Sequence, residues 1–212
     1  VVLASLVANG AIAVMKFVGF LLTGSAAMLS ETYQSVSDTG NQIFLLFGIR
    51  YSERQADRDH PFGYGKARFF YSFLVSVLLF GVAGIESARK GYETLVGGGS
   101  FHVSNATVPG VGVTLSGTTI SYAVLLFAIA FESWALKKAY DGMKAQIREH
   151  DWSGFREAFR KTSDTTTLTA LTEDAIALAG AAIGIVGIYL TEQTGNTMYD
   201  GIAAMLIGVL LM

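Results

Sequence analysis

Four side chains with oxygen atoms that can ligate a metal lie at helical spacing in the second apolar segment of this chain: Glu31, Gln34, Asp38 and Asn41. The intervals of three, four and three residues place all four on one face of an α-helix. A charged side chain at the centre of a bilayer costs roughly 2.5–3.5 kcal/mol on insertion scales, so such residues persist where they have a partner or a task. Carboxylate and amide oxygens are ligands for divalent cations. The stripe therefore indicates a cation-binding face on a membrane helix.

A second acidic pair, Glu173 and Asp174, lies in another apolar segment. Asp38 and Asp174 both fall near the middle of their segments, and we expect these segments to be antiparallel with their midpoints at one depth. Adjacent helical residues point about 100° apart, so both carboxylates can be ligands only if the helix presents its edge to the site. We rank Asp174 first as a ligand and Glu173 second. Two carboxylates close together in a low dielectric take up protons, and metal entry expels them because ligands must be deprotonated. This chemistry predicts an exchange of a divalent cation for protons.

Other polar residues of the apolar segments have simpler interpretations. Gln34 and Asn41, taken alone, are typical of hydrogen bonds between membrane helices. We expect Glu132 to be an interfacial carboxylate that pairs with Lys137 or Arg50, and Glu86 to pair with Arg89 or Lys90 in the same way. Lys16, within the first apolar segment, either extends its ammonium to the membrane surface or pairs with a buried carboxylate.

Composition indicates an all-α membrane protein, since 51% of the residues are hydrophobic, the mean hydropathy is +0.45 and there are two prolines. A membrane helix needs about 20 mostly apolar residues. The loop that precedes Gly117 is rich in Ser, Thr, Val and Gly and favours a short extended hairpin. Read for apolar length, the chain has six candidate spans, which predict a six-transmembrane-helix bundle: 1–22, 26–49, 67–95, 117–140, 164–190 and 197–212.

The distribution of charge predicts the topology. Lysine and arginine gather around the connections at 50–68 and 137–161, whereas none lies between Lys90 and Lys137. The positive-inside rule places these two connections in the cytoplasm, and with six spans it places both termini there too. The absence of cysteine excludes disulfides and thiolate metal sites. The net charge of -2 shows no basic character that would indicate a nucleic-acid partner.

Three stretches of the sequence resemble the cation diffusion facilitator family. Residues 24–38 are similar to the family's second span, residues 57–66 (Asp-Arg-Asp-His-Pro-Phe-Gly-Tyr-Gly-Lys) to its cytoplasmic signature, and residues 200–209 to its last span. The likeness covers essentially the whole chain, which is similar to the divergent branch that includes mitochondrial zinc transporter nine. It implies a six-helix transporter, usually a homodimer, that exports Zn²⁺ or a similar ion such as Mn²⁺ or Fe²⁺ from the cytoplasm in exchange for protons.

The resemblance also implies a transport site with two residues from the second span and two from the fifth. On this chain these positions are Gln34, Asp38, Ala170 and Asp174. Alanine cannot ligate a metal, so one of three neighbouring oxygen ligands has to replace Ala170: Glu173, Asn41 or Glu31.

A second metal site of the family lies in the cytoplasmic connection, where its positions correspond to Asp57, His60 and Tyr64. Tyrosine stands where some members have histidine, and an equally good interpretation is that Asp57 and His60 order the loop. Family members usually continue into a cytoplasmic metal-binding domain. This chain stops at Met212, so we expect that domain to be deleted, disordered or absent.

Two other functions are compatible with the same residues. One is a metal-binding membrane sensor or scaffold that does not translocate its ion. The other is an intramembrane hydrolase with Asp38 and Asp174 as acid and base, although the sequence has no His-Glu-x-x-His motif. We expect no enzyme and no cofactor: the divalent cation is the substrate, and protons, membrane lipid and a second copy of the chain are the partners. The expected location is multi-pass in a membrane, the inner membrane of a bacterium or an organelle membrane of a eukaryote.

Overall fold

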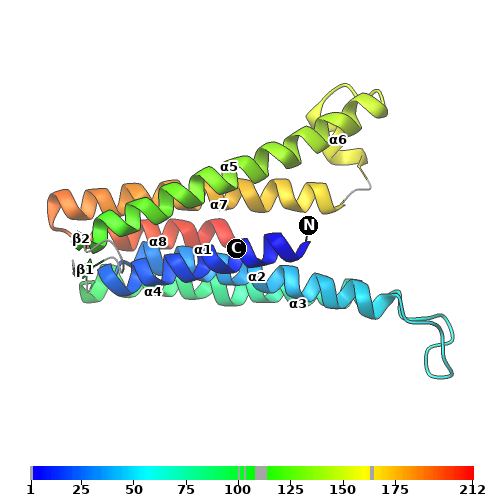
Figure 1. Ribbon diagram of the computed structural model, residues 1–212, viewed down its shortest axis with the longest axis horizontal. Helices are drawn as coiled ribbons and strands as arrows, with labels where there is room; N and C mark the ends of the chain where they lie inside the picture. The colour runs from blue at the N-terminus through cyan, green and yellow to red at the C-terminus, as the bar shows by residue number, and fades with distance from the viewer. Residues whose placement is uncertain (1, 100, 103, 108–113, 163–164) are drawn as a thin grey trace.

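The computed structural model describes residues 2–99, 101–102, 104–107, 114–162 and 165–212, and most of them are helical (Figure 1). A short antiparallel hairpin, β1 (Asn105–Thr107) with β2 (Thr114–Ser116), confirms the extended loop before Gly117. The helices in chain order are α1 (Val2–Thr23), α2 (Ala26–Ser52), α3 (Ala67–Leu78), a π-helical segment (Leu79–Ile85), α4 (Glu86–Gly97), α5 (Gly117–Glu149), α6 (Phe155–Lys161), α7 (Thr165–Thr194) and α8 (Met198–Leu211).

The prediction of a helical membrane protein agrees with these elements. Among the described residues, two helical stretches are long and apolar enough to cross a membrane, Gly117–Glu149 and Ala170–Thr194, and two shorter ones are apolar, Asn9–Thr23 and Met198–Leu211. Helix α2 fails that test of composition because it carries the polar stripe. The expected third span is divided into α3, the π-helical segment and α4. The first residues of the expected spans 1–22 and 164–190 lie outside the described residues.

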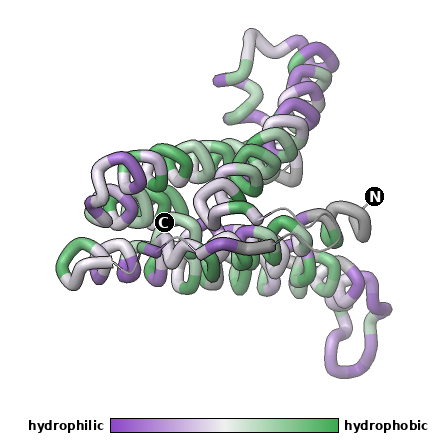
Figure 2. Tube along the Cα trace, turned by 60° about the vertical axis from the view of Figure 1, so that its left-hand side comes forward, coloured by the Kyte–Doolittle hydropathy of each residue, from purple (hydrophilic) through white to green (hydrophobic). Residues whose placement is uncertain are grey.

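The connections alternate between the two ends of the bundle. The turn at residues 24–25, the β1–β2 hairpin and the turn between α7 and α8 gather at one end, and the charged link 53–66 and α6 lie at the other (Figure 1). Hydrophilic residues concentrate in this link and in the far part of α5, whereas much of the helical bundle is hydrophobic (Figure 2). Towards the end that carries these charges, the α5–α7 pair diverges from α1, α2 and α3 (Figure 1).

The bundle has an apolar surface and a partly polar interior, the reverse of a soluble protein. Phe73, Val186 and Leu206 are exposed, while Lys16 and Glu31 are completely buried. Burying such groups is tolerable only where they meet partners, and exposing large apolar side chains is favourable in lipid. The burial pattern therefore suits a membrane environment.

Close backbone contact joins α4 to α8. A Cβ on Gly91 would lie 2.6 Å from the carbonyl oxygen of Gly201, and a Cβ on Gly208 would lie 2.6 Å from the backbone nitrogen of Ala88. Small residues let membrane helices approach to van der Waals contact of their backbones, which is the main source of their association in lipid. Larger side chains at these positions would force α4 and α8 apart.

Asp200, in the first turn of α8, caps the N-terminus of α2. Its carboxylate accepts hydrogen bonds from the Ser25 hydroxyl at 2.5 Å, from the Ala27 amide at 3.2 Å and from the Ala26 amide. The amides at a helix N-terminus have no partner within the helix and carry a partial positive charge, so a carboxylate there is stabilising. This contact fixes the start of α2, and with it the depth of the polar stripe.

The link after the fourth expected span folds as a helical hairpin. Helix α5 continues to Glu149, and α6 folds back so that Phe155 stacks on Tyr140 with ring centroids 4.8 Å apart. Glu157 accepts hydrogen bonds from Lys161 at 2.6 Å and from Ser153, and these bonds hold the pKa of Glu157 at about 2. The end of α5 and helix α6 thus form this link and pack on each other.

Candidate metal-transport site

The polar stripe of α2 faces the interior of the bundle. Glu31, Gln34 and Asn41 are 0%, 2% and 5% exposed, and Asp38 is partly buried. Helix α2 contacts α1, α3, α4, α7 and α8, so its polar face has protein on several sides. The structure thus buries three residues of the stripe inside the bundle and Asp38 in part.

Lys16 on α1 forms an ion pair with the first residue of the stripe. Its Nζ lies 2.7 Å from Glu31 Oε2, and neither side chain is more than 1% exposed. Of the two interpretations of Lys16 from sequence, the pairing with a buried carboxylate is the one confirmed. Breaking such a pair by removing one partner typically costs about 3–5 kcal/mol, because an uncompensated charge stays buried.

Gly180 provides the space for Glu31 and Gln34 between α2 and α7. A Cβ at Gly180 would lie 2.5 Å from Glu31 Oε1 and 3.0 Å from Gln34 Oε1, so an alanine methyl would have to displace the Glu31 carboxylate and would be in tight contact with Gln34. The small residues of α7 therefore serve close packing between helices of one chain, and they bring α7 within reach of the polar stripe.

Asn41 and Glu173 join the lower part of the stripe to α7. The Asn41 side-chain amide donates to Glu173 Oε1 at 2.7 Å, so the Glu173 carboxylate is turned towards α2. A hydrogen bond to a charged group contributes about 1.5–3 kcal/mol in a folded protein. Two residues that the sequence offered as replacements for Ala170 are thus in direct contact.

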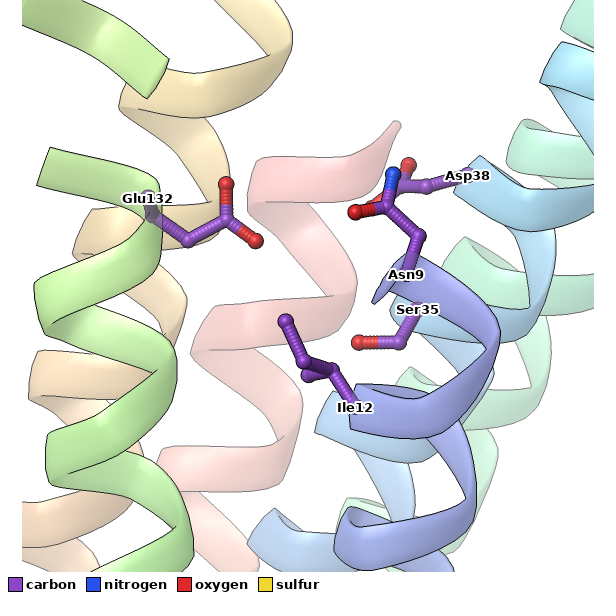
Figure 3. A pocket seen from close by; sticks show the side chains of 5 residues that line it. All are labelled: Asn9, Ile12, Ser35, Asp38 and Glu132. Atoms are coloured by element: carbon purple, nitrogen blue, oxygen red, sulfur yellow. The ribbon is translucent and has the colours of Figure 1, made fainter. Parts of the chain in front are cut away.

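Asp38 lines a small cavity of about 10 Å³ together with Asn9, Ile12, Ser35 and Glu132 (Figure 3). Such a volume holds about one water molecule or one small ion. Asn9 and Asp38 come from α1 and α2, and Glu132 reaches towards them from α5 on the opposite side (Figure 3). The arrangement presents two carboxylates, an amide and a hydroxyl to one space.

The position of Glu132 corrects a sequence-based expectation. We expected an interfacial carboxylate paired with Lys137 or Arg50, but among the described residues no ion pair joins Glu132 to either cation, and its side chain lines the cavity. Charge counting along the chain favoured the nearby Lys137, whereas α5 turns Glu132 inward. Glu86 lies 3.5 Å from Arg89 as expected.

The acids are in electrostatic range of one another without forming one compact cluster. The carboxylates of Glu173, Glu132 and Glu31 act on Asp38, and the carboxylate of Asp174 acts on Glu132. Among the described residues no group of three His, Cys, Asp or Glu side chains is close enough to hold a metal ion. The structure therefore brings Asn41 to Glu173 and places Asp38 and Glu132 around one cavity. Asp174, a described residue, is not among the residues that line this cavity.

In the link between α2 and α3, Asp57 orders the loop through several hydrogen bonds. The Tyr64 hydroxyl donates to Asp57 Oδ2 at 2.6 Å, and the His60 and Asp59 amides donate to Oδ1 at 2.7 and 3.1 Å. The Tyr64 hydrogen bond, followed by the His60 amide, lowers the pKa of Asp57, and the same bond raises the pKa of Tyr64. The His60 ring stacks on Tyr64 with centroids 4.1 Å apart. These contacts order the loop, as expected if Asp57 and His60 have a structural role there.

Comparison with known proteins identifies the class of protein that this fold and this polar interior define. Residues 2–212 match the cation efflux transmembrane domain, so the chain belongs to the cation efflux family, the cation diffusion facilitators. The resemblance seen in the sequence is confirmed. This family consists of cation transporters and not of enzymes, which removes the intramembrane hydrolase from the alternatives.

Relatives with assigned names include metal transporters of eukaryotes. The chain is 28% identical over 211 residues to the mitochondrial proton-coupled zinc antiporter SLC30A9 of Homo sapiens, covering 100% of this chain and 34% of that protein. It is 29% identical over 201 residues to metal tolerance protein C4 of Arabidopsis thaliana, covering 93% of this chain and 40% of that protein. It is 40% identical over 80 residues to the magnetosome protein MamM of Paramagnetospirillum magneticum, covering 37% of this chain and 25% of that protein. The chain thus spans well under half the length of these relatives.

Proposed function

We propose that this chain is the membrane part of a secondary transporter that moves a divalent cation out of the cytoplasm in exchange for protons, with Zn²⁺ the favoured substrate. The observation that carries the proposal is the buried stripe of α2, which meets α7 at Gly180 and at Glu173 and meets α5 across the cavity at Glu132. Acidic residues inside a membrane protein mark ion and proton pathways. The name of the human relative, a proton-coupled zinc antiporter, supports the choice of ion and countersubstrate.

The proposed topology has six spans with both termini in the cytoplasm. The spans are α1, α2, the continuous helical stretch from α3 to α4, α5, α7 and α8. The charged link 53–66 and α6 lie at one end of the bundle, as the positive-inside rule requires of cytoplasmic connections (Figure 1). A homodimer is part of the same proposal. Its test is the mass of the protein in detergent.

We propose Asp38 and Asp174 as the principal ligands, completed by Glu173, Gln34, Asn41 and Glu31. These residues come from two antiparallel helices, so a small displacement of α7 relative to α2 changes which oxygens can reach one ion. Helices α5 and α7 diverge from α1 and α2 towards the end that carries the basic connections (Figure 1). A movement that closes this end would bring the acids together, as alternating access requires.

Flux measurements test this function. The protein is placed in liposomes that contain a metal-sensitive dye, Zn²⁺ is added outside, and the interior is made more acidic than the exterior. We expect Zn²⁺ to enter when protons can leave, and we expect Asp38→Ala or Asp174→Ala to abolish the flux while the protein stays helical. A parent protein that binds Zn²⁺ but gives no flux under any pH gradient would support the sensor or scaffold instead.

The flux of each variant is compared with that of the parent protein. Glu86→Gln is the matched control, since Glu86 is a partly exposed acid, with 43% of its side chain accessible, that pairs with Arg89. Its flux is expected to equal that of the parent. If Asp38→Ala or Asp174→Ala also transports at the parent rate, that residue is not a ligand.

A further inference from the structure

Lys16 is a full positive charge within the bundle. Its ammonium is 1% exposed, lies on α1 and donates to Glu31 Oε2 of α2 at 2.7 Å. A buried lysine is expensive in a membrane protein and is a functional residue by default. Two well-packed apolar residues would hold α1 against α2 at least as well as this ion pair does, so stability alone explains it poorly.

The carboxylate that Lys16 contacts has a second oxygen without a partner. Glu31 Oε1 and Gln34 Oε1 are both buried and accept no hydrogen bond in the part of the chain that the structure describes. Both oxygens face Gly180, where a Cβ would lie 2.5 and 3.0 Å from them. Buried acceptors left unpaired are costly, and a cation is one of the ligands that can satisfy them.

Lys16 is also connected to the cavity around Asp38. Asn9 and Ile12, which line that cavity, precede Lys16 by seven and four residues on α1 and share its helical face. The Lys16 ammonium is within electrostatic range of Asp38 and Glu132. One lysine thus offsets part of the negative charge of Glu31, Asp38 and Glu132.

We propose that Lys16 is a tethered counter-cation of the transport site, which a divalent cation replaces at Glu31 when it binds to Glu31 and Gln34. This inference rests on the proposed function and assigns Lys16 a positioning role within it. While no metal is bound, the ammonium neutralises Glu31. When a divalent cation arrives, the ammonium repels it, so Lys16 weakens binding and speeds release. A transporter needs such weakening because an ion held too tightly cannot leave.

The inference predicts that Zn²⁺ can stand in for the missing charge of a Lys16→Met variant. We expect this variant to melt at a lower temperature than the parent without metal, and Zn²⁺ to raise its melting temperature more than that of the parent. Its dissociation constant for Zn²⁺ should fall by roughly tenfold or more, because a unit charge near a divalent ion in a partly buried site is worth at least that factor. Lys16→Arg keeps the charge and should behave like the parent.

Two further variants separate this role from a structural ion pair. Lys16→Met combined with Glu31→Gln removes both charges, and we expect it to fold without metal and to lose the large response to Zn²⁺. Lys138→Met, on an exposed lysine that lies over Trp134, is the control for loss of a lysine elsewhere and should bind Zn²⁺ as the parent does. All measurements use the full chain in detergent with Zn²⁺ alone.

Two results would show that Lys16 is a structural residue and that the inference is wrong. One is that Lys16→Met binds Zn²⁺ no more tightly than the parent. The other is that Lys16→Met stays unfolded with Zn²⁺ while the double variant folds. Such a result leaves the proposed function intact as long as the parent transports Zn²⁺ in liposomes. A parent that neither binds nor transports a divalent cation refutes the proposed function itself.

Discussion

Single residues in this protein show how a membrane helix bundle holds acids without bringing them all together. Glu31 is balanced by Lys16 at 2.7 Å, and Glu173 accepts a hydrogen bond from Asn41 at 2.7 Å. Asp38 and Glu132 face one cavity from opposite sides. Like charges in a low dielectric repel strongly, and this spacing limits the repulsion. A divalent cation is the kind of ligand that would favour drawing them together.

The position of Glu132 gives the first residue-scale prediction. Because its carboxylate lines the cavity of Asp38, Glu132→Gln should lower proton-driven Zn²⁺ flux by roughly tenfold, the factor that corresponds to about 1.4 kcal/mol of lost stabilisation. Glu86, whose partly exposed carboxylate pairs with Arg89, again supplies the control, since Glu86→Gln removes the same charge from the same type of side chain. Equal flux in the two variants would show that Glu132 has no part in transport.

A second residue-scale prediction concerns the loop held by Asp57. The pKa of Asp57 is lowered, first by the Tyr64 hydrogen bond, so its contribution to loop order is complete above the ordinary aspartate pKa of about 3.9. That contribution is lost as the pH falls through the lowered value. Tyr64→Phe brings the pKa back towards the ordinary value, so the loop should lose its order at a higher pH.

Hydrogen exchange of the loop measures this difference. The amides of Asp59 and His60 donate to Asp57, and their protection, corrected for the intrinsic exchange rate, reports whether the carboxylate is ionised and bonded. We expect weaker protection in Tyr64→Phe at neutral pH, and loss of the remainder at a less acid pH than in the parent. Identical protection in both proteins at every pH would contradict this account of the loop.

Helices α2 and α7 are the elements on which the site depends. The Asp200 carboxylate fixes the start of α2, and Gly180 lets α7 approach the polar stripe. In lipid this approach depends on packing, because helices gain little from the hydrophobic effect there. A methyl group at residue 180 would therefore displace an oxygen of the polar stripe.

Gly180→Ala and Gly184→Ala test this sensitivity as a pair. A Cβ at residue 180 would collide with Glu31 Oε1, whereas a Cβ at residue 184 would meet Leu125 and Glu31 Cγ at ordinary contact distances of 3.6 and 3.7 Å. We expect Gly180→Ala to weaken Zn²⁺ binding roughly tenfold, the effect of losing about 1.4 kcal/mol of binding free energy. Gly184→Ala should bind as the parent does, and a similar loss in both variants would mean that the close approach at Gly180 has no special role.

At the scale of the whole molecule, the sequence predicts the helical class and much of the polar interior. Long apolar segments and the i, i+3, i+7, i+10 stripe depend only on residues that are close in the sequence, so they can be recognised without knowing how the helices pack. The partner of Lys16 and the inward direction of Glu132 depend on how α1, α2 and α5 pack, which no local pattern specifies. The turn of Asp200 onto the start of α2 is likewise a contact between residues 174 positions apart. Its one local signal is an acid close to the start of an apolar segment.

The central claim is that carboxylates of α2 and α7 jointly bind the transported cation inside the bundle. Anomalous scattering at the zinc edge, from crystals of the protein soaked in Zn²⁺, locates such an ion directly. We predict a peak between α2 and α7 along the stripe from Glu31 to Asp38, with carboxylate oxygens about 2.0–2.2 Å from the metal. A peak confined to the Asp57 loop, or no peak within the bundle in crystals that contain Zn²⁺, would contradict the account.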